Sequence, residues 1–124
     1  MKKMWYICNP FHLQTTKVEQ QLMLNINSKK PSECTNIAEV RNEIDCIDHV
    51  IIDLLSQRFQ YVKEVVKYKD STPGSIEAPE RRRAVLECRR RWAEECGLNA
   101  DVVERMYDNL IQYFIDEEKK IKNI

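Results

Sequence analysis

Glycine is scarce in this chain: only Gly74 and Gly97 occur among 124 residues, together with four prolines. Folds built from many short strands need a tight turn at most strand ends, and glycine supplies much of the backbone freedom that such turns require. The scarcity therefore argues against a strand-rich fold. Hydrophobic residues make up 43% of the chain and charged residues 32%, which is typical of helices with an apolar stripe and a charged outer face. We expect an all-α fold.

Metal ligands are also few. His12 and His49 are the only histidines, and the five cysteines include no C-x-x-C pair. The cysteines are scattered and odd in number: Cys8, Cys34, Cys46, Cys88 and Cys96. This pattern predicts reduced thiols of a cytoplasmic protein rather than a disulfide framework, and it predicts no metal site.

The chain has no excess charge of either sign, because twenty lysines and arginines balance twenty aspartates and glutamates. No net field therefore recruits nucleic acid or an anionic membrane. The apolar run in MKKMWYIC is broken at once by Asn9 and Pro10, which makes a poor signal peptide, and no stretch is long enough to span a bilayer. We expect neither nucleic acid nor a membrane as a partner.

The periodic part of the chain begins after an appendage, residues 1–33, and forms one helical domain, residues 34–124. From Thr35 to Lys69, with Thr35 or Asn36 as the cap, we expect one helix. Its heptad positions are Ile37, Val40, Ile44, Ile47, Ile51, Leu54, Tyr61, Val65 and Tyr68. Such a helix would be about 50 Å long, more than a domain of this size covers by itself. We therefore expect a partner chain.

Two shorter helices follow. Residues 70–78, DSTPGSIEA, combine a Pro-Gly pair with small polar residues and predict a mobile loop. Pro79 suits a first helical turn and Gly97 a C-terminal stop, which bounds the second helix. Asn99 or Asp101 can cap the third helix. The apolar stripe of the third helix is Val103, Tyr107, Leu110, Ile111 and Phe114.

Charged residues interrupt these stripes at two places. Arg58 lies seven residues after Ile51, at a position that its helix otherwise gives to the core. Glu118 lies four residues after Phe114 and does the same on the third helix. A desolvated guanidinium needs an anionic partner. The two residues therefore form either a buried structural ion pair or part of a site for a charged ligand.

A helical count places Lys69 on the face of Arg58. Eleven residues at about 100° each return to within roughly 20° of the same direction, about 16 Å further along the axis. Both long side chains can lean toward a small ligand between them. Arg41 is rotated by roughly 80 to 100° from them and lies about 42 Å from Lys69. Arg41 thus either joins the site of a neighbouring subunit or is a solvated surface residue.

The arginine runs at 81–83 and 89–91 suggest a different function. They resemble a nucleic-acid patch, but glutamates interleave with them: Glu80, Glu87, Glu94 and Glu95. This mixture favours a solvated helix face. Nucleic-acid binding remains an alternative, as does a non-catalytic helical dimer that holds an aromatic precursor or a partner protein.

Four strings stand out between residues 31 and 118: PSECTNIAEVRNEIDCID, LLSQRFQYVKEVVKYK, APERR and RRWAEECGLNADVVERMYDNLIQYFIDEE. They resemble the all-helical chorismate mutase family, and most closely its isochorismate pyruvate-lyase branch. The resemblance implies a three-helix protomer with one long N-terminal helix, an intertwined homodimer and a pericyclic reaction without metal or organic cofactor. It implies conversion of isochorismate to salicylate and pyruvate, or alternatively of chorismate to prephenate.

The resemblance also implies roles for five residues. Arg41 matches an arginine that the partner subunit donates to a substrate carboxylate, and Arg58 matches a carboxylate-binding arginine of the same chain. Lys69 matches the lysine that contacts the ether oxygen of the substrate. Glu118 matches a position that donates a hydrogen bond to that oxygen, and Glu80 matches a glutamate of the substrate site.

Two departures from the family pattern bear on the reaction. Bacterial members typically carry glutamine where this chain has Glu118, and a carboxylate donates a hydrogen bond only when it is protonated. Some fungal mutases share the glutamate. Mutases tend to carry an aspartate and an arginine where this chain has Ile76 and Pro79, which resembles the lyase branch instead. We therefore expect a lyase with two catalytic residues, Lys69 and Glu118, and three substrate-binding residues, Arg41, Arg58 and Glu80.

Overall fold

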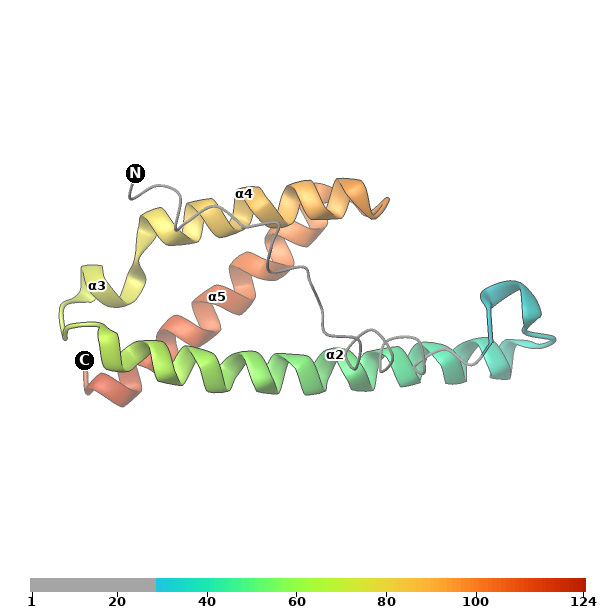
Figure 1. Ribbon diagram of the computed structural model, residues 1–124, viewed down its shortest axis with the longest axis horizontal. Helices are drawn as coiled ribbons and strands as arrows, with labels where there is room; N and C mark the ends of the chain where they lie inside the picture. The colour runs from blue at the N-terminus through green and yellow to red at the C-terminus, as the bar shows by residue number, and fades with distance from the viewer. Residues whose placement is uncertain (1–28) are drawn as a thin grey trace. The chain divides into compact units, whose positions relative to one another are not determined.

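The computed structural model describes residues 29–124, which contain helices and no strand. The elements are η3 Pro31–Glu33, α2 Ile37–Val65, η4 Val66–Tyr68, α3 Pro73–Glu77, α4 Pro79–Glu95 and α5 Ala100–Lys122 (Figure 1). They belong to two compact units, whose described parts are residues 29–60 and residues 61–124. The expected all-α fold is confirmed. Most of the predicted appendage, residues 1–33, lies outside the described residues.

The start of α2 shows which of the two predicted caps is used. Asn36 Oδ1 accepts a hydrogen bond from the backbone N–H of Glu39 at 2.9 Å. The Glu39 carboxylate reaches back to the backbone N–H of Thr35 at 2.8 Å, and this hydrogen bond lowers the pKa of Glu39. Asn36 is therefore the cap, and α2 begins at Ile37.

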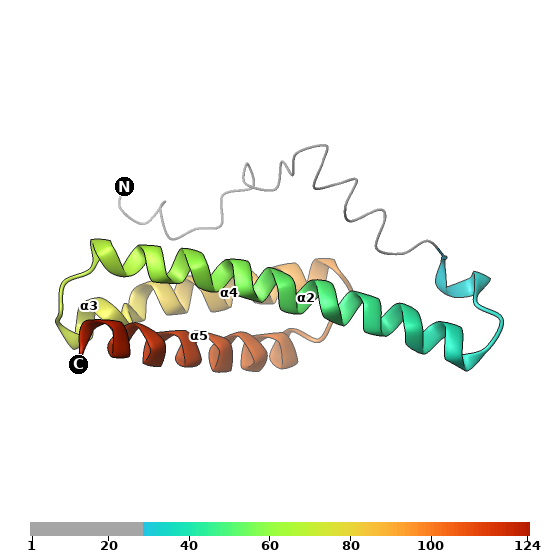
Figure 2. The ribbon, with the colours of Figure 1, turned by 90° about the horizontal axis from the view of Figure 1, so that it is seen from below.

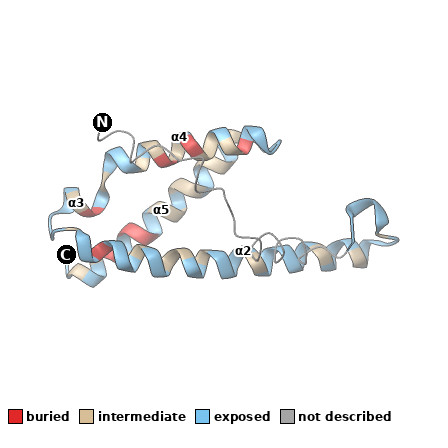
Figure 3. Ribbon diagram, viewed as in Figure 1, coloured by how far each residue is buried: buried red, intermediate tan, exposed pale blue. Residues whose placement is uncertain are grey.

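The apolar heptad of α2 is exposed in the single chain. No residue of α2 is buried, and Figure 3 shows the helix in the colours of exposed and intermediate residues. The exposed fractions along the heptad are Ile37 64%, Val40 41%, Ile44 50%, Ile47 37%, Ile51 48% and Leu54 46%. A continuous seam of large aliphatic side chains is rarely left in water by a monomeric protein. The first unit thus presents a surface that is suited to a partner helix.

In the second unit, α4 and α5 are antiparallel neighbours joined by a short turn (Figures 1 and 2). Gly97 adopts the left-handed conformation with φ 75°, as expected of a C-terminal stop. Asn99 caps α5 by accepting the backbone N–H of Val102 at 3.1 Å. Among residues 29–124, the buried apolar residues all belong to this unit: Val66, Ile76, Val85, Cys88, Ala93, Phe114 and Ile115.

Two arginines of α4 hold it to α5. Arg82 Nε donates to Asp108 Oδ1 at 2.8 Å. Further along, Arg90 Nη1 donates to Asp101 at 2.7 Å and also to Glu104. Both hydrogen bonds raise the pKa of Arg90, and the bond to Asp101 has the larger effect. The same bond lowers the pKa of Asp101. The arginine runs therefore serve in part to join the two helices.

The long helix ends earlier than the heptad predicts. The α-helix stops at Val65, and the chain tightens into the 3₁₀ turn η4 before Lys69, which is extended with φ −103° and ψ 144°. The helical count that placed Lys69 on the face of Arg58 assumed α-helix throughout. The prediction of one continuous α-helix to Lys69 is wrong, and the count does not apply across η4.

The predicted loop at residues 70–78 contains the short helix α3. Thr72 Oγ1 accepts the backbone N–H of Ser75 at 3.3 Å, and Pro73 occupies the first helical turn. Ala78, with φ 40°, ends α3 and begins the turn into α4. Helical start signals therefore outweigh the turn propensity of the Pro-Gly pair.

The cysteines differ from the expectation at one position. Cys34, Cys46 and Cys96 are free thiols in the described part of the chain. Cys88 is 1% exposed and is disulfide-bonded. An odd number of scattered cysteines does not exclude a single pair, because pairing depends on distance in space rather than spacing in sequence. The prediction that every cysteine is reduced is wrong at Cys88.

Candidate functional site

A buried ion pair lies between the residue that follows η4 and helix α5. Lys69 Nζ donates to Glu118 Oε2 at 3.1 Å and to Glu118 Oε1 at 3.3 Å. The side chains are only 19% and 6% exposed, respectively. Because both carboxylate oxygens accept from the same ammonium, the pair is fixed in direction as well as in distance. The structure thus brings together the two residues that were predicted to be catalytic.

The ammonium has a further acceptor on α3. Lys69 Nζ donates to the backbone carbonyl oxygen of Ile76 at 3.1 Å. The side chain of Ile76 is 0% exposed, so this part of α3 is anchored in the interior. An ammonium has three N–H donors: the carbonyl oxygen of Ile76 takes one and the two oxygens of Glu118 can share another, which leaves one for a ligand. The cation is therefore held from two directions, by α3 and by α5.

Local backbone features bring Lys69 to this position. Val66, which is 3% exposed, is the buried residue of η4, and η4 contacts α5. Asp70 then accepts from the hydroxyl of Thr72 and from its backbone N–H at 2.9 Å. Both hydrogen bonds lower the pKa of Asp70, and the bond from the Thr72 hydroxyl has the larger effect. The chain is thereby turned from η4 into α3 with Lys69 at the corner.

The surroundings of the pair define what it can do chemically. A largely dehydrated cation interacts more strongly with a developing negative charge than a solvated one. Lys69 can donate to an oxygen that gains charge, and Glu118 can accept a hydrogen bond or, when protonated, donate one. Such an arrangement is suited to stabilising charge on an oxygen of a small bound molecule.

The other three predicted site residues are not members of this ion pair. Arg41 is exposed and Arg58 is half-buried, both on the part of α2 that belongs to the first unit. Their placement beside Lys69 and Glu118 remains a prediction. Glu80 is exposed in the first turn of α4. It borders a shallow hollow of about 380 Å³ that is also lined by Gly74, Ser75, Ala78, Pro79 and Arg81.

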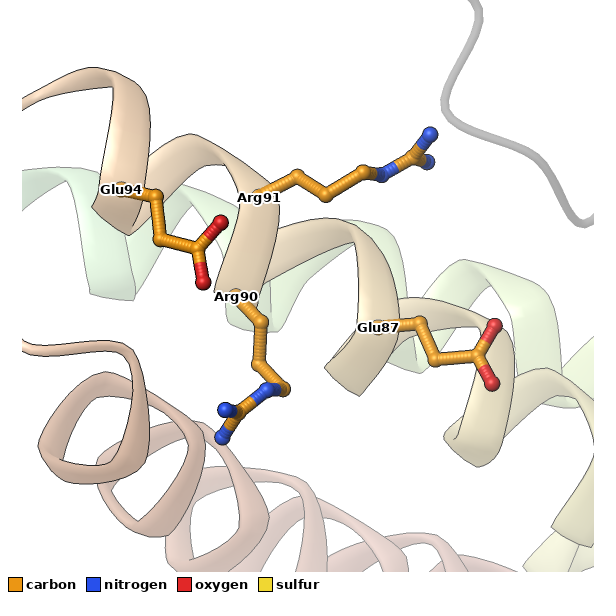
Figure 4. A pocket seen from close by; sticks show the side chains of 4 residues that line it. All are labelled: Glu87, Arg90, Arg91 and Glu94. Atoms are coloured by element: carbon orange, nitrogen blue, oxygen red, sulfur yellow. The ribbon is translucent and has the colours of Figure 1, made fainter.

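A second hollow, of about 490 Å³, lies on α4 among the arginine runs. Its lining residues are Glu87, Arg90, Arg91 and Glu94 (Figure 4). Arg90 points toward α5, where it pairs with Asp101, whereas Arg91 points away from it. The hollow therefore has two acidic and two basic side chains rather than a field of one sign. This mixture agrees with a solvated helix face.

Sequence analysis missed the carbonyl oxygen of Ile76 as an acceptor for Lys69. The signal that could have found it is the pair Thr72 and Pro73, an N-cap followed by proline at the first helical position. Within residues 29–124, no helix has the length and apolarity to cross a membrane, and no group of three His, Cys, Asp or Glu side chains could hold a metal ion.

Comparison with known proteins places this geometry in a family. The chorismate mutase type II model matches residues 40–119. An isochorismate pyruvate lyase of Pseudomonas aeruginosa is 44% identical over 92 residues, which cover 74% of this chain and 90% of that protein. A T-protein of Haemophilus influenzae is 40% identical over 68 residues, 55% of this chain but only 18% of that protein. A chorismate mutase of Methanocaldococcus jannaschii is 27% identical over 77 residues, 62% of this chain and 78% of that protein. The chain, all-helical where it is described, belongs to the chorismate mutase type II family.

Proposed function

We propose that this chain is an enzyme that splits isochorismate into salicylate and pyruvate. The observation that carries the proposal is the buried Lys69–Glu118 pair, which holds an ammonium in position for an oxygen of a small ligand. The relative named isochorismate pyruvate lyase supports the choice of reaction, since the match covers 90% of its length. A pericyclic fragmentation requires neither a nucleophile nor a general base, so positioning and charge stabilisation are the tasks left to the protein.

Lys69 and Glu118 act on the ether oxygen in this proposal. As the carbon–oxygen bond breaks, negative charge builds on that oxygen, and the ammonium of Lys69 donates a hydrogen bond to it. Glu118 lies 3.1 Å from the same ammonium and contributes a second donor when it carries a proton. The pair thus stabilises the transition state more than the bound substrate.

The arginines bind the two carboxylates of the substrate. Their forked donors fix a carboxylate in orientation as well as in position, which restrains a flexible enolpyruvyl ether in its reactive shape. Arg58 acts within its own chain and Arg41 is donated by the second subunit of a homodimer. The exposed heptad of α2 supports the homodimer, because association would cover its apolar seam. Glu80 contacts the substrate from the start of α4.

The proposal includes no metal and no organic cofactor. It places the enzyme in the cytoplasm, and its partner is a small molecule rather than nucleic acid or a membrane.

The second candidate is a chorismate mutase that forms prephenate, as the main or a side activity. The family model and the relative named chorismate mutase favour it. The rival outside enzymology is a helical dimer that binds an aromatic precursor or a partner protein without changing it.

Turnover of the two acids separates these candidates. Purified protein is incubated with isochorismate and, separately, with chorismate, and salicylate, pyruvate and prephenate are measured. We expect salicylate and pyruvate in equal amounts from isochorismate. Prephenate from chorismate as the sole product would favour the mutase. Binding of either acid without any product would favour the non-catalytic dimer.

Replacing Glu118 by glutamine should flatten the pH profile of turnover. A carboxylate accepts but does not donate, so the wild type needs the proton of Glu118 for this hydrogen bond. The amide of Glu118→Gln donates at every pH, so this variant should lose the dependence and turn over faster at neutral pH. Glu117→Gln, the same change one residue earlier, should keep the wild-type profile. An unchanged profile in Glu118→Gln would show that Glu118 never needs its proton.

A further inference from the structure

A second ion pair joins α3 to α5 beside the site. Lys119 Nζ lies 2.9 Å from Glu77 Oε1, and the side chains are 29% and 51% exposed, respectively. Neither residue has a role in the proposed reaction. The pair joins residues that are 42 positions apart in the sequence, so it connects two elements rather than two turns of one helix.

The position of this pair gives it a consequence for Lys69. Glu77 directly follows Ile76, whose carbonyl oxygen accepts from Lys69 Nζ at 3.1 Å. Lys119 directly follows Glu118, whose carboxylate accepts from the same ammonium at 3.1 Å. Two links thus run side by side between the same two stretches of chain. One passes through Lys69, and the other is the direct contact between Glu77 and Lys119.

Helix α3 needs such support. It has five residues, and helices of this length do not hold their shape in water without tertiary contacts. Its position is set by the cap at Thr72, by the buried side chain of Ile76 and by the bond between Glu77 and Lys119. If α3 moves away from α5, the ammonium of Lys69 loses one of its three acceptors and its direction is less well defined.

We propose that Glu77 and Lys119 are positioning residues: their ion pair clamps α3 to α5 and so keeps the Lys69 ammonium aimed at the reacting oxygen. The inference deepens the proposed function and rests on it. A half-exposed ion pair contributes modestly, and its strength falls as salt screens the charges. The clamp is therefore expected to tune turnover rather than to decide it.

The test compares three variants with the wild type: Glu77→Gln, Lys119→Gln and the exchange Glu77→Lys with Lys119→Glu. We expect each single variant to lower kcat on isochorismate by about two- to fivefold, the range for such a pair, and the exchange to restore most of the loss. Added salt should lower the kcat of the wild type toward the kcat of the single variants. The kcat of the single variants should depend less on salt, because they lack the ion pair. An effect of net charge on substrate attraction would instead change KM in opposite directions in the two single variants.

Hydrogen exchange provides a readout that is independent of turnover. The backbone N–H groups of Ile76 and Ala78 are bonded within the α3 segment, to Thr72 and Gly74 at 3.2 and 3.0 Å. The hydrogen-exchange rate of these two groups should rise about two- to fivefold in both single variants. It should return to the wild-type rate in the double variant Glu77→Lys with Lys119→Glu. The matched controls are Glu117→Gln and Lys120→Gln, which break a 2.7 Å pair within α5 and should leave exchange and kcat unchanged.

Unchanged exchange in the single variants would overturn the clamp. Faster exchange with unchanged kcat, or equal effects in the Glu117 and Lys120 controls, would overturn its link to Lys69. Should the wild type convert neither acid, the proposed function fails, and the exchange rates still decide whether the pair holds α3.

Discussion

Replacing Lys69 by alanine should lower kcat on isochorismate by about 10²- to 10³-fold, the range expected when an oriented donor is removed from an oxygen that gains charge. The ammonium is held by Glu118 and by the carbonyl oxygen of Ile76, each at 3.1 Å, and the substitution removes it entirely. Glu118, which is 5% exposed, then loses its counter-ion. Breaking a buried pair in this way costs about 3–5 kcal/mol of folding free energy, so the melting temperature should fall as well.

Two further variants separate catalysis from stability. In the double variant Lys69→Ala with Glu118→Gln, the neutral amide needs no counter-ion, so the melting temperature should recover while kcat stays low. Lys67→Ala removes an exposed lysine that pairs with Glu64 at 2.9 Å, and it should change neither quantity. A kcat that recovers together with the melting temperature would show that Lys69 has only a structural role.

Helices α2, α4 and α5, apart from the C-terminal end of α2, could be predicted because they carry local start or stop signals. Asn36 and Asn99 provide caps, Pro79 a first turn and Gly97 a left-handed stop, and the structure uses all four. These signals act over three or four residues. They are therefore readable without knowledge of the tertiary contacts.

The contact between Lys69 and Glu118 was harder to predict than the burial of Glu118. Glu118 breaks an apolar stripe, which marks a buried charge in any sequence. The partner of that charge depends on η4 and α3, where the backbone leaves the α-helix that the heptad indicates. The heptad period of the apolar residues does not reveal such a change, because it describes only regular α-helix. The resemblance, which assigns both residues to one substrate oxygen, predicted that they lie close together, whereas the helical count did not.

The same reasoning explains what the heptad of α2 does and does not establish. Its period predicts an apolar seam, and the structure shows that seam exposed on the first unit. The proposed role of Arg41 depends in addition on contacts between two chains, for which the folding of one chain supplies only half of the surface. A substitution within the seam therefore tests the dimer and the role of Arg41 together.

Replacing Ile51 by aspartate should convert the proposed dimer to monomers. Ile51 is 48% exposed in the single chain and lies on the heptad seam. Only about half of each Ile51 side chain is left for the dimer to bury, so each dimer would lose about 1.5–3 kcal/mol in total and would have to desolvate two unpaired carboxylates. The dissociation constant should rise by at least about 10- to 10²-fold, which follows from the apolar part alone at 1.4 kcal/mol per factor of ten. Sedimentation equilibrium over a range of concentrations measures this shift.

Turnover should be lost with the dimer, because the proposed site takes Arg41 from the second subunit. The matched control is His49→Asp, which places the same carboxylate two residues away and about 160° around α2, on a side chain that is 79% exposed. That variant should keep the mass of the dimer and the wild-type kcat. If Ile51→Asp stays dimeric, the seam of α2 is not the interface. If it becomes monomeric and retains full turnover, each chain holds a complete site and Arg41 has no part in it.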